Sequence, residues 1–111
     1  MKKLKGKKQI EQLFEEGDSI NDFPLRLIYL ESKNSGFGVS VGKRSFKLAV
    51  HRNRIKRQLR AAAEQYLFQV LIDTKKPYNF MAIYTGKSMP NWDEIGEKFQ
   101  SIAKKIKQKE L

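Results

Sequence analysis

The fold is decided by a change of hydrophobic period within residues 37–60, which read Phe-Gly-Val-Ser-Val-Gly-Lys-Arg-Ser-Phe-Lys-Leu-Ala-Val-His-Arg-Asn-Arg-Ile-Lys-Arg-Gln-Leu-Arg. In the first part, large apolar side chains alternate with glycine and serine, which is the period of two of a strand with one bulky face. From Ile55 to Val70, apolar residues recur at the helical period. We therefore predict a strand over residues 37–43, followed by a long helix that begins near residue 50.

The same two periods predict the elements on either side of this stretch. Those elements are helices over residues 7–16 and 92–106 and strands over residues 24–31 and 79–85. Asn91 followed by Glu94 resembles a capping box at the start of the last helix. With a length of 111 residues, this order predicts one α+β domain over residues 1–111, a two-layer sandwich whose helices pack on one small sheet.

Small residues give one face of the predicted sheet a shallow surface. If the strands over residues 24–31 and 37–43 pair as a hairpin, their large side chains form the core. Gly38, Ser40 and Gly42 then leave room for a base or a backbone to approach closely. The alternative is that these residues only relieve twist or crowding in the sheet.

Positive charge is concentrated in the middle of the chain. The sequence has 23 Lys and Arg residues against 12 Asp and Glu residues, a formal net charge of +11. The window between Glu31 and Glu64 contains no acidic residue and nine basic ones: Lys33, Lys43, Arg44, Lys47, Arg52, Arg54, Lys56, Arg57 and Arg60. Because clustered like charges oppose folding until a partner neutralises them, we expect a polyanion, and nucleic acid fits better than a membrane surface. A basic face kept only for solubility is the alternative.

The start of the long helix adds a second argument for an anionic partner. Arg52 and Arg54 stand in its first turns, where the helix dipole disfavours cations and attracts anions. A phosphate bound at the exposed amides would remove this conflict. By contrast, the lysines near the end of the last helix suit its dipole, and we expect them to be structural and solvated.

The residues predict neither a catalytic group nor a metal site in the protein itself. The chain has no cysteine and His51 is its only histidine, which excludes thiolate sites and a mechanism with two histidines. Four aspartates fall in predicted loops or caps: Asp18, Asp22, Asp73 and Asp93. No apolar run is long enough to cross a membrane, and the lysine-rich start lacks the apolar segment of an export signal, so we expect a cytoplasmic protein.

The basic segment Arg52-Asn53-Arg54-Ile55-Lys56-Arg57-Gln58-Leu59-Arg60 resembles the RNR-x-KR-x-x-R helix of the bacterial ribonuclease P protein subunit. The resemblance continues through Leu4 and Lys5, the first helix and Gly17, the strand over residues 37–44, and the final strand and helix. It implies an αβββαβα fold with a left-handed βαβ crossover, which the residue pattern alone does not predict.

Members of this family assemble with a large catalytic RNA, and the holoenzyme removes the 5′ leader from precursor tRNA. The resemblance therefore implies a monomeric protein subunit of an endoribonuclease, with ribonuclease P RNA and precursor tRNA as partners. Hydrolysis is expected to use Mg2+ held by the RNA, without a catalytic residue, a membrane or a small-molecule substrate on the protein side. A general or ribosome-associated RNA-binding module is the alternative, since it would carry the same charge.

The resemblance also implies two sets of site residues. Eight are expected to contact the catalytic RNA: Lys43, Arg44, Arg52, Asn53, Arg54, Lys56, Arg57 and Arg60. Five are expected to line a central cleft that holds the leader between the first helix and the open sheet face: Ile10, Phe14, Arg26, Ile28 and Ser40. Bases would lie against Phe14 and phosphates near Arg26. The spacing of Ile10 and Phe14 equally fits a helix face packed into the core.

Overall fold

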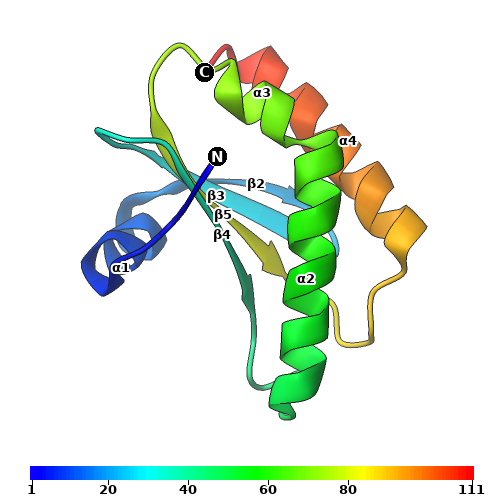
Figure 1. The fold of residues 1–111 in the computed structure, drawn as a ribbon. Coiled ribbons are helices and arrows are strands. Elements are labelled where there is room, and N and C mark those ends of the chain that lie inside the picture. The colour runs from blue at the N-terminus through cyan, green and yellow to red at the C-terminus, as the bar shows by residue number, and fades with distance from the viewer.

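The computed structural model describes all 111 residues. Its elements are, in chain order, β1 (Lys2–Lys3), α1 (Lys7–Glu16), β2 (Asp18–Asp22), β3 (Leu25–Glu31), β4 (Gly36–Val41), α2 (Ala49–Tyr66), α3 (Phe68–Ile72), β5 (Tyr78–Tyr84) and α4 (Trp92–Lys109). The strands form one sheet in the order β1-β4-β5-β3-β2. Helices α2, α3 and α4 cover one face and α1 lies on the other (Figure 1). The predicted α+β class is confirmed, and none of the helices is long and apolar enough to span a membrane.

β5 occupies the centre of the sheet and is apolar on both faces. Phe80 and Ala82 are buried on the side of α2, and Met81 is buried on the side of α1. The strand pairs antiparallel with β3 and parallel with β4. The hairpin considered for residues 24–31 and 37–43 does not form, because β3 and β4 each pair with β5 instead of with each other. A central strand must bury both faces, and the apolar run of β5 allows this.

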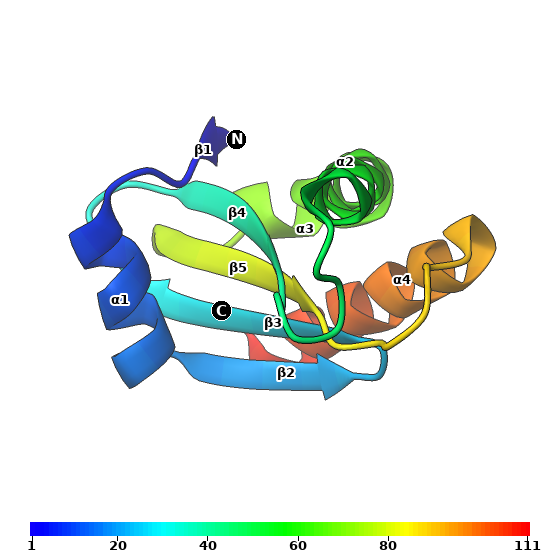
Figure 2. The ribbon, with the colours of Figure 1, turned by 90° about the horizontal axis from the view of Figure 1, so that it is seen from below.

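The connection from β4 to β5 through α2 and α3 is a crossover between parallel neighbouring strands. When the sheet is viewed with α2 in front and both strands pointing upward, β5 lies to the left of β4 (Figure 1 and Figure 2). The crossover is therefore left-handed, as the family resemblance implied, and this hand is rare in βαβ units. It places the start of α2 near the end of β4, where the basic residues are concentrated.

β2 is a strand that the hydrophobic pattern did not predict. Its sequence, Asp-Ser-Ile-Asn-Asp, has one buried apolar residue, Ile20, so it shows no alternation. The prediction that Asp18 and Asp22 lie in loops or caps is wrong for this reason, since both belong to the antiparallel ladder with β3. β2 and the short β1 form the two edges of the sheet, where polar side chains can face water.

Two apolar clusters fill the two sides of the sheet. The larger one has 21 buried residues and lies between the sheet and helices α2, α3 and α4; it includes Ile55 and Leu59 of the predicted helical stripe. The smaller one lies beneath α1 and consists of Leu4, Leu13, Ile28 and Met81. The helix predicted to continue to Val70 ends at Tyr66, and Leu67 separates it from α3.

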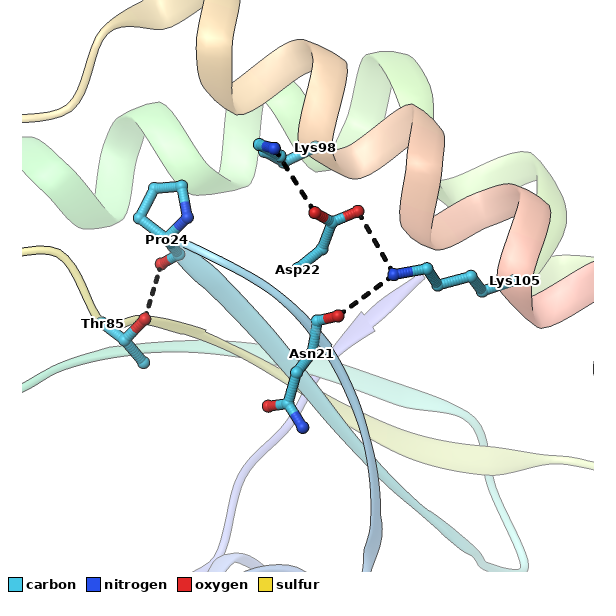
Figure 3. Close-up of polar contacts among 6 residues, drawn as sticks. All are labelled: Asn21, Asp22, Pro24, Thr85, Lys98 and Lys105. Carbon is cyan, nitrogen blue, oxygen red and sulfur yellow. Dashed lines mark hydrogen bonds and ion pairs between the residues drawn. The ribbon is translucent and has the colours of Figure 1, made fainter.

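Polar contacts join β2 to α4 (Figure 3). The Asp22 carboxylate oxygens lie 3.5 Å from the ammonium nitrogens of Lys98 and Lys105. Burial raises the pKa of Asp22, but a hydrogen bond from Ser101 and the charges of the two lysines outweigh burial, so its pKa lies below the ordinary value of 3.8. Asp22 is therefore ionised at neutral pH and holds the edge strand against the helix.

The turn between β2 and β3 is held at two further points. The Thr85 hydroxyl at the end of β5 donates to the Pro24 carbonyl at 3.1 Å, and the Thr85 amide donates to the same carbonyl at 2.8 Å (Figure 3). Lys105 donates to the Asn21 carbonyl at 3.1 Å. These hydrogen bonds fix the end of the sheet at which β2 and β3 turn.

Candidate nucleic-acid interface

The connection from β4 to α2 is held in place by its own contacts. Phe46 is buried, and its ring centroid lies 6.0 Å from that of Tyr84. The guanidinium of Arg52 donates to the backbone carbonyl of Phe46 at 2.7 Å and to that of Lys47 at 2.8 Å. Arg52 therefore ties the connection to the first turn of α2, so it has a structural role in addition to the RNA contact that the resemblance implied.

The eight residues that the resemblance assigned to the catalytic RNA are called the basic surface below. They are Lys43, Arg44, Arg52, Asn53, Arg54, Lys56, Arg57 and Arg60. The structure brings them together along the connection from β4 and the first turns of α2. Most of them are exposed; Arg52 and Lys56 are half-buried because they flank Ile55 and Leu59, which face the core.

The charges of the basic surface have no counter-charge within the protein. The three ion pairs in the structure involve other lysines: Lys76 with Glu31, and Lys98 and Lys105 with Asp22. In addition, α2 has no acidic residue in its first turn and no side-chain hydrogen bond at its N-cap. Free amides, a positive dipole end and unpaired cations coincide here, which is the arrangement that binds phosphate.

α1 covers part of the sheet face opposite α2. Leu13 is fully buried in one cluster with Ile28 and Met81, and Ile10 is half-buried against that cluster. Ile28 lies on the face that the alternation predicted, but at 4% exposure it offers almost no surface to a ligand. Ile10 therefore packs against the cluster with part of its side chain still exposed, whereas Phe14 is 51% exposed and available for contact.

The next row of that sheet face is uncovered, because α1 crosses the strands at one end of the sheet only (Figure 2). The strand register places Asn21 beside Arg26, Arg26 beside Ile83 and Ile83 beside Ser40, in one row across four strands. These four residues and Phe14 are called the open face below. No pocket of the structure is lined by them, so the surface is shallower than the predicted cleft.

The family model for ribonuclease P matches residues 1–107. The chain belongs to the ribonuclease P protein family. The ribonuclease P protein component of Pseudanabaena sp. (strain PCC 6903) is 32% identical over 108 residues, which cover 95% of this chain and 90% of that protein. The ribonuclease P protein component of Lactobacillus helveticus (strain DPC 4571) is 32% identical over 71 residues, 61% of this chain and 58% of that protein. The family predicted from the basic segment is thus confirmed.

Solved ribonuclease P proteins have the same fold. The Staphylococcus aureus protein matches with a TM-score of 0.73 and 19% identity, covering 96% of each chain. The Thermotoga maritima protein matches with a TM-score of 0.74 and 19% identity, covering 95% of this chain and 97% of that one. At this identity the likeness concerns the fold alone.

Two residues of the open face in this ribonuclease P family member were not predicted from the sequence. Ile83 lies two positions from Met81 in β5, and the alternation of that strand would have placed it on the side of α1. Asn21 belongs to β2, which the hydrophobic pattern did not reveal. The structure also contains no group of three or more His, Cys, Asp or Glu side chains placed to hold a metal ion.

Proposed function

We propose that this ribonuclease P protein binds the catalytic RNA through its basic surface and the single-stranded 5′ leader of precursor tRNA on its open face. The observation that supports this most directly is that the two surfaces meet at the end of β4. Ser40 belongs to the open face, and Lys43 and Arg44 of the basic surface follow the strand after Gly42. Catalytic RNA and leader would therefore lie side by side on the protein.

The basic surface suits the phosphate backbone of a folded RNA. Because its cations have no carboxylate partners, contact with phosphates breaks no ion pair within the protein. Each neutralised phosphate releases condensed counterions, so affinity should fall with salt at a log–log slope of about −0.7 to −0.9 per phosphate. The free amides at the start of α2 offer a further site for a backbone oxygen.

The open face suits a single strand. The exposed ring of Phe14 can stack on a base, an interaction worth about 1 to 3 kcal/mol. Arg26 supplies a charge for a phosphate. Asn21 supplies a hydrogen-bonding group beside it, and Ser40 supplies another in the same row, on the far side of Ile83. Only the precursor carries a leader, so this surface would raise the affinity for precursor tRNA over mature tRNA.

In this proposal the RNA performs the hydrolysis with Mg2+ that the RNA holds. The positive charges of the protein reduce the repulsion among the phosphates of RNA and substrate, so that Mg2+ is bound at a lower concentration. The protein contributes binding and positioning and no catalytic residue. We assign it to the cytoplasm as a single protein subunit of a ribonucleoprotein.

The test is cleavage of a precursor tRNA at low magnesium by a bacterial ribonuclease P RNA, with the protein, without it, and with the protein alone. We expect the mixture to remove the leader faster than the RNA does by itself. Cleavage by the protein alone would mean that the protein has an active site of its own. No stimulation, together with equal binding to unrelated structured RNAs, would favour the general RNA-binding module.

A further inference from the structure

A small polar pocket is lined by residues of β1, the start of α1 and the start of β4. These elements come together at one corner of the sheet (Figure 2). Its volume is about 150 Å3. Its lining includes Lys2, Lys5, Gln9, Ser35 and Asn79. This amino-terminal pocket contains no residue of the basic surface or of the open face, so neither of the RNA contacts proposed above accounts for it.

Asn79 is the unusual residue of the pocket, because it is only 8% exposed although its side chain is polar. It lies in β5 between Leu30 of β3 and Gly36 of β4, and its side chain takes part in none of the side-chain hydrogen bonds of the structure. Gly36 leaves the amide open to the pocket, since a Cβ there would lie 3.0 Å from Asn79 Oδ1. Gln58 Oε1 is the only fully buried polar side-chain atom without a hydrogen-bond partner, so the amide of Asn79 still reaches solvent and is open to a ligand that enters the pocket.

The charge of the pocket specifies an anion. Lys2, Lys3 and Lys5 line it, whereas no aspartate or glutamate does. None of these lysines forms an ion pair. A ligand in the pocket can therefore accept hydrogen bonds from several ammonium groups at the same time. A phosphate group, with several acceptor oxygens on one centre, has this chemistry.

A second pocket connects the basic surface to the amino-terminal pocket. Its volume is about 200 Å3, and Lys3 and Arg60, at the far end of the basic surface, line it together with one acidic residue, Glu64. A nucleic-acid backbone that follows α2 as far as Arg60 therefore reaches the amino-terminal pocket by continuing over the β1 edge of the sheet. This continuity favours a phosphate within an RNA backbone over a free phosphate ion as the occupant.

We propose that the amino-terminal pocket binds one phosphate group, supplied by the backbone of the RNA that the basic surface binds. The identity of that RNA rests on the proposed function, whereas the capacity of the pocket for phosphate does not. Two experiments separate these claims. One uses inorganic phosphate and the full chain without RNA, and the other uses a ribonuclease P RNA.

The first experiment is a titration of the 15N-labelled protein with inorganic phosphate, compared with sodium chloride at equal ionic strength. We expect saturable NMR shifts of the Asn79 side-chain amide and the Gly36 backbone amide with phosphate only. Asn79→Asp places a carboxylate in the pocket and should abolish the Gly36 shift, whereas Gln108→Glu makes the same charge change in the last turn of α4 and should preserve it. The remaining resonances report whether each variant is folded. An absence of saturable shifts in the unmodified protein overturns the site.

The second experiment measures binding of the ribonuclease P RNA at several salt concentrations. Lys2→Ala/Lys5→Ala should reduce the magnitude of the log–log salt slope by about 0.7 to 0.9, the contribution of one phosphate. Lys107→Ala/Lys109→Ala removes the same charge near the end of α4 and should leave the slope unchanged. Saturable NMR shifts with phosphate, together with equal salt slopes for the two double variants, would assign the pocket to free phosphate and overturn the RNA assignment. If the unmodified protein does not distinguish this RNA from unrelated RNAs, the proposed function fails, and the phosphate titration still decides the site.

Discussion

Arg52 and Arg54 belong to the same basic segment, but the structure uses them differently. Arg52 donates hydrogen bonds to the carbonyls of Phe46 and Lys47, whereas Arg54 is exposed and has neither a hydrogen bond nor an ion pair. We expect Arg52→Ala to lower the free energy of unfolding by about 1 to 2 kcal/mol, because two carbonyls lose a charged donor. Arg54→Ala should change it by less than about 0.5 kcal/mol. Urea unfolding of both variants measures the difference.

The same pair of variants separates structure from binding. Each removes one positive charge, so both should weaken RNA binding at low salt. Arg52→Lys keeps the charge but replaces the planar guanidinium, and we expect it to recover RNA affinity more fully than stability. Equal stability of Arg52→Ala and Arg54→Ala would show that the contacts of Arg52 do not hold the connection.

Leu13 and Phe14 are neighbours in α1 with opposite environments. Leu13 is fully buried beneath the helix, and Phe14, which belongs to the open face, is 51% exposed. Leu13→Ala should lower the free energy of unfolding by about 2 to 5 kcal/mol, because it leaves a cavity against the sheet. Phe14→Ala should lower the free energy of unfolding by about 1 kcal/mol or less, because the exposed ring buries much less apolar surface. A loss of stability at Phe14 as large as that at Leu13 would assign the ring to the core.

At the scale of elements, the attachment of β2 to α4 predicts a dependence on pH. Asp22→Asn removes the charge that both Lys98 and Lys105 contact, and should lower the free energy of unfolding by about 1 kcal/mol near pH 7. The pKa of Asp22 is lower in the folded protein than its ordinary value of 3.8, so its stabilising effect is present above that value. The effect is lost as the pH falls through the folded pKa, where the carboxylate becomes protonated.

Urea unfolding of Asp22→Asn and the unmodified protein, near pH 7 and again near pH 2.5, measures this difference. Glu97→Gln is the matched control, because Glu97 is an exposed carboxylate of α4 without an ion pair. The difference at Asp22 should become smaller in acid, whereas the control should stay close to the unmodified protein at both pH values. A deficit of Asp22→Asn that persists unchanged in acid would mean that the ion pairs are not its cause.

Elements with their own hydrophobic period could be predicted from the sequence, and elements defined by their neighbours could not. α1, α2, α4, β3, β4 and β5 each show a period or an apolar run, and the structure contains all of them. β2 has only Ile20 as an apolar anchor and becomes a strand because β3 offers an edge to pair with. The position of β5 between β3 and β4 is likewise a property of tertiary pairing, which no local pattern contains.

The same division applies to the candidate site. The basic surface could be predicted because a run of cations on one helix is visible in the sequence, and the structure gathers those residues as expected. On the open face, alternation placed Arg26 and Ser40 on the correct side of the sheet. It also placed Ile28 there, but the burial of Ile28 depends on where α1 lies, which the sequence pattern does not specify. The second role of Arg52 likewise depends on the path of the connection between β4 and α2.

At the scale of the whole molecule, the sheet separates two surfaces with different chemistry. The basic surface lies with α2 on one side of the sheet, and the open face lies beside α1 on the other side (Figure 2). One is dense in charge, and the other combines an aromatic ring with a single cation from Arg26. A protein built in this way should bind two RNA segments with different dependence on salt.

Variants of the two surfaces should therefore have separable effects. Arg54→Ala/Arg57→Ala should reduce the magnitude of the log–log salt slope for the catalytic RNA by about 1.4 to 1.8, because two phosphate contacts are lost. It should leave the ratio of precursor to mature tRNA affinity within the assembled holoenzyme nearly unchanged. Phe14→Ala should leave the slope unchanged and lower that ratio by the equivalent of about 1 to 3 kcal/mol, because one base loses its stacking partner.

Filter binding of the catalytic RNA to the protein, and of both tRNAs to the assembled holoenzyme, measures the two quantities on the same preparations. Lys107→Ala/Lys109→Ala controls for the loss of charge in the first assay, since α4 carries these lysines away from both surfaces. Leu30→Ala controls for altered packing beneath α1 in the second, because Leu30 is half-buried against the small cluster and is not part of the open face. Equal effects of Arg54→Ala/Arg57→Ala and Phe14→Ala in both assays would mean that one continuous RNA contact covers the protein. That result would contradict the assignment of the catalytic RNA to the basic surface and of the leader to the open face.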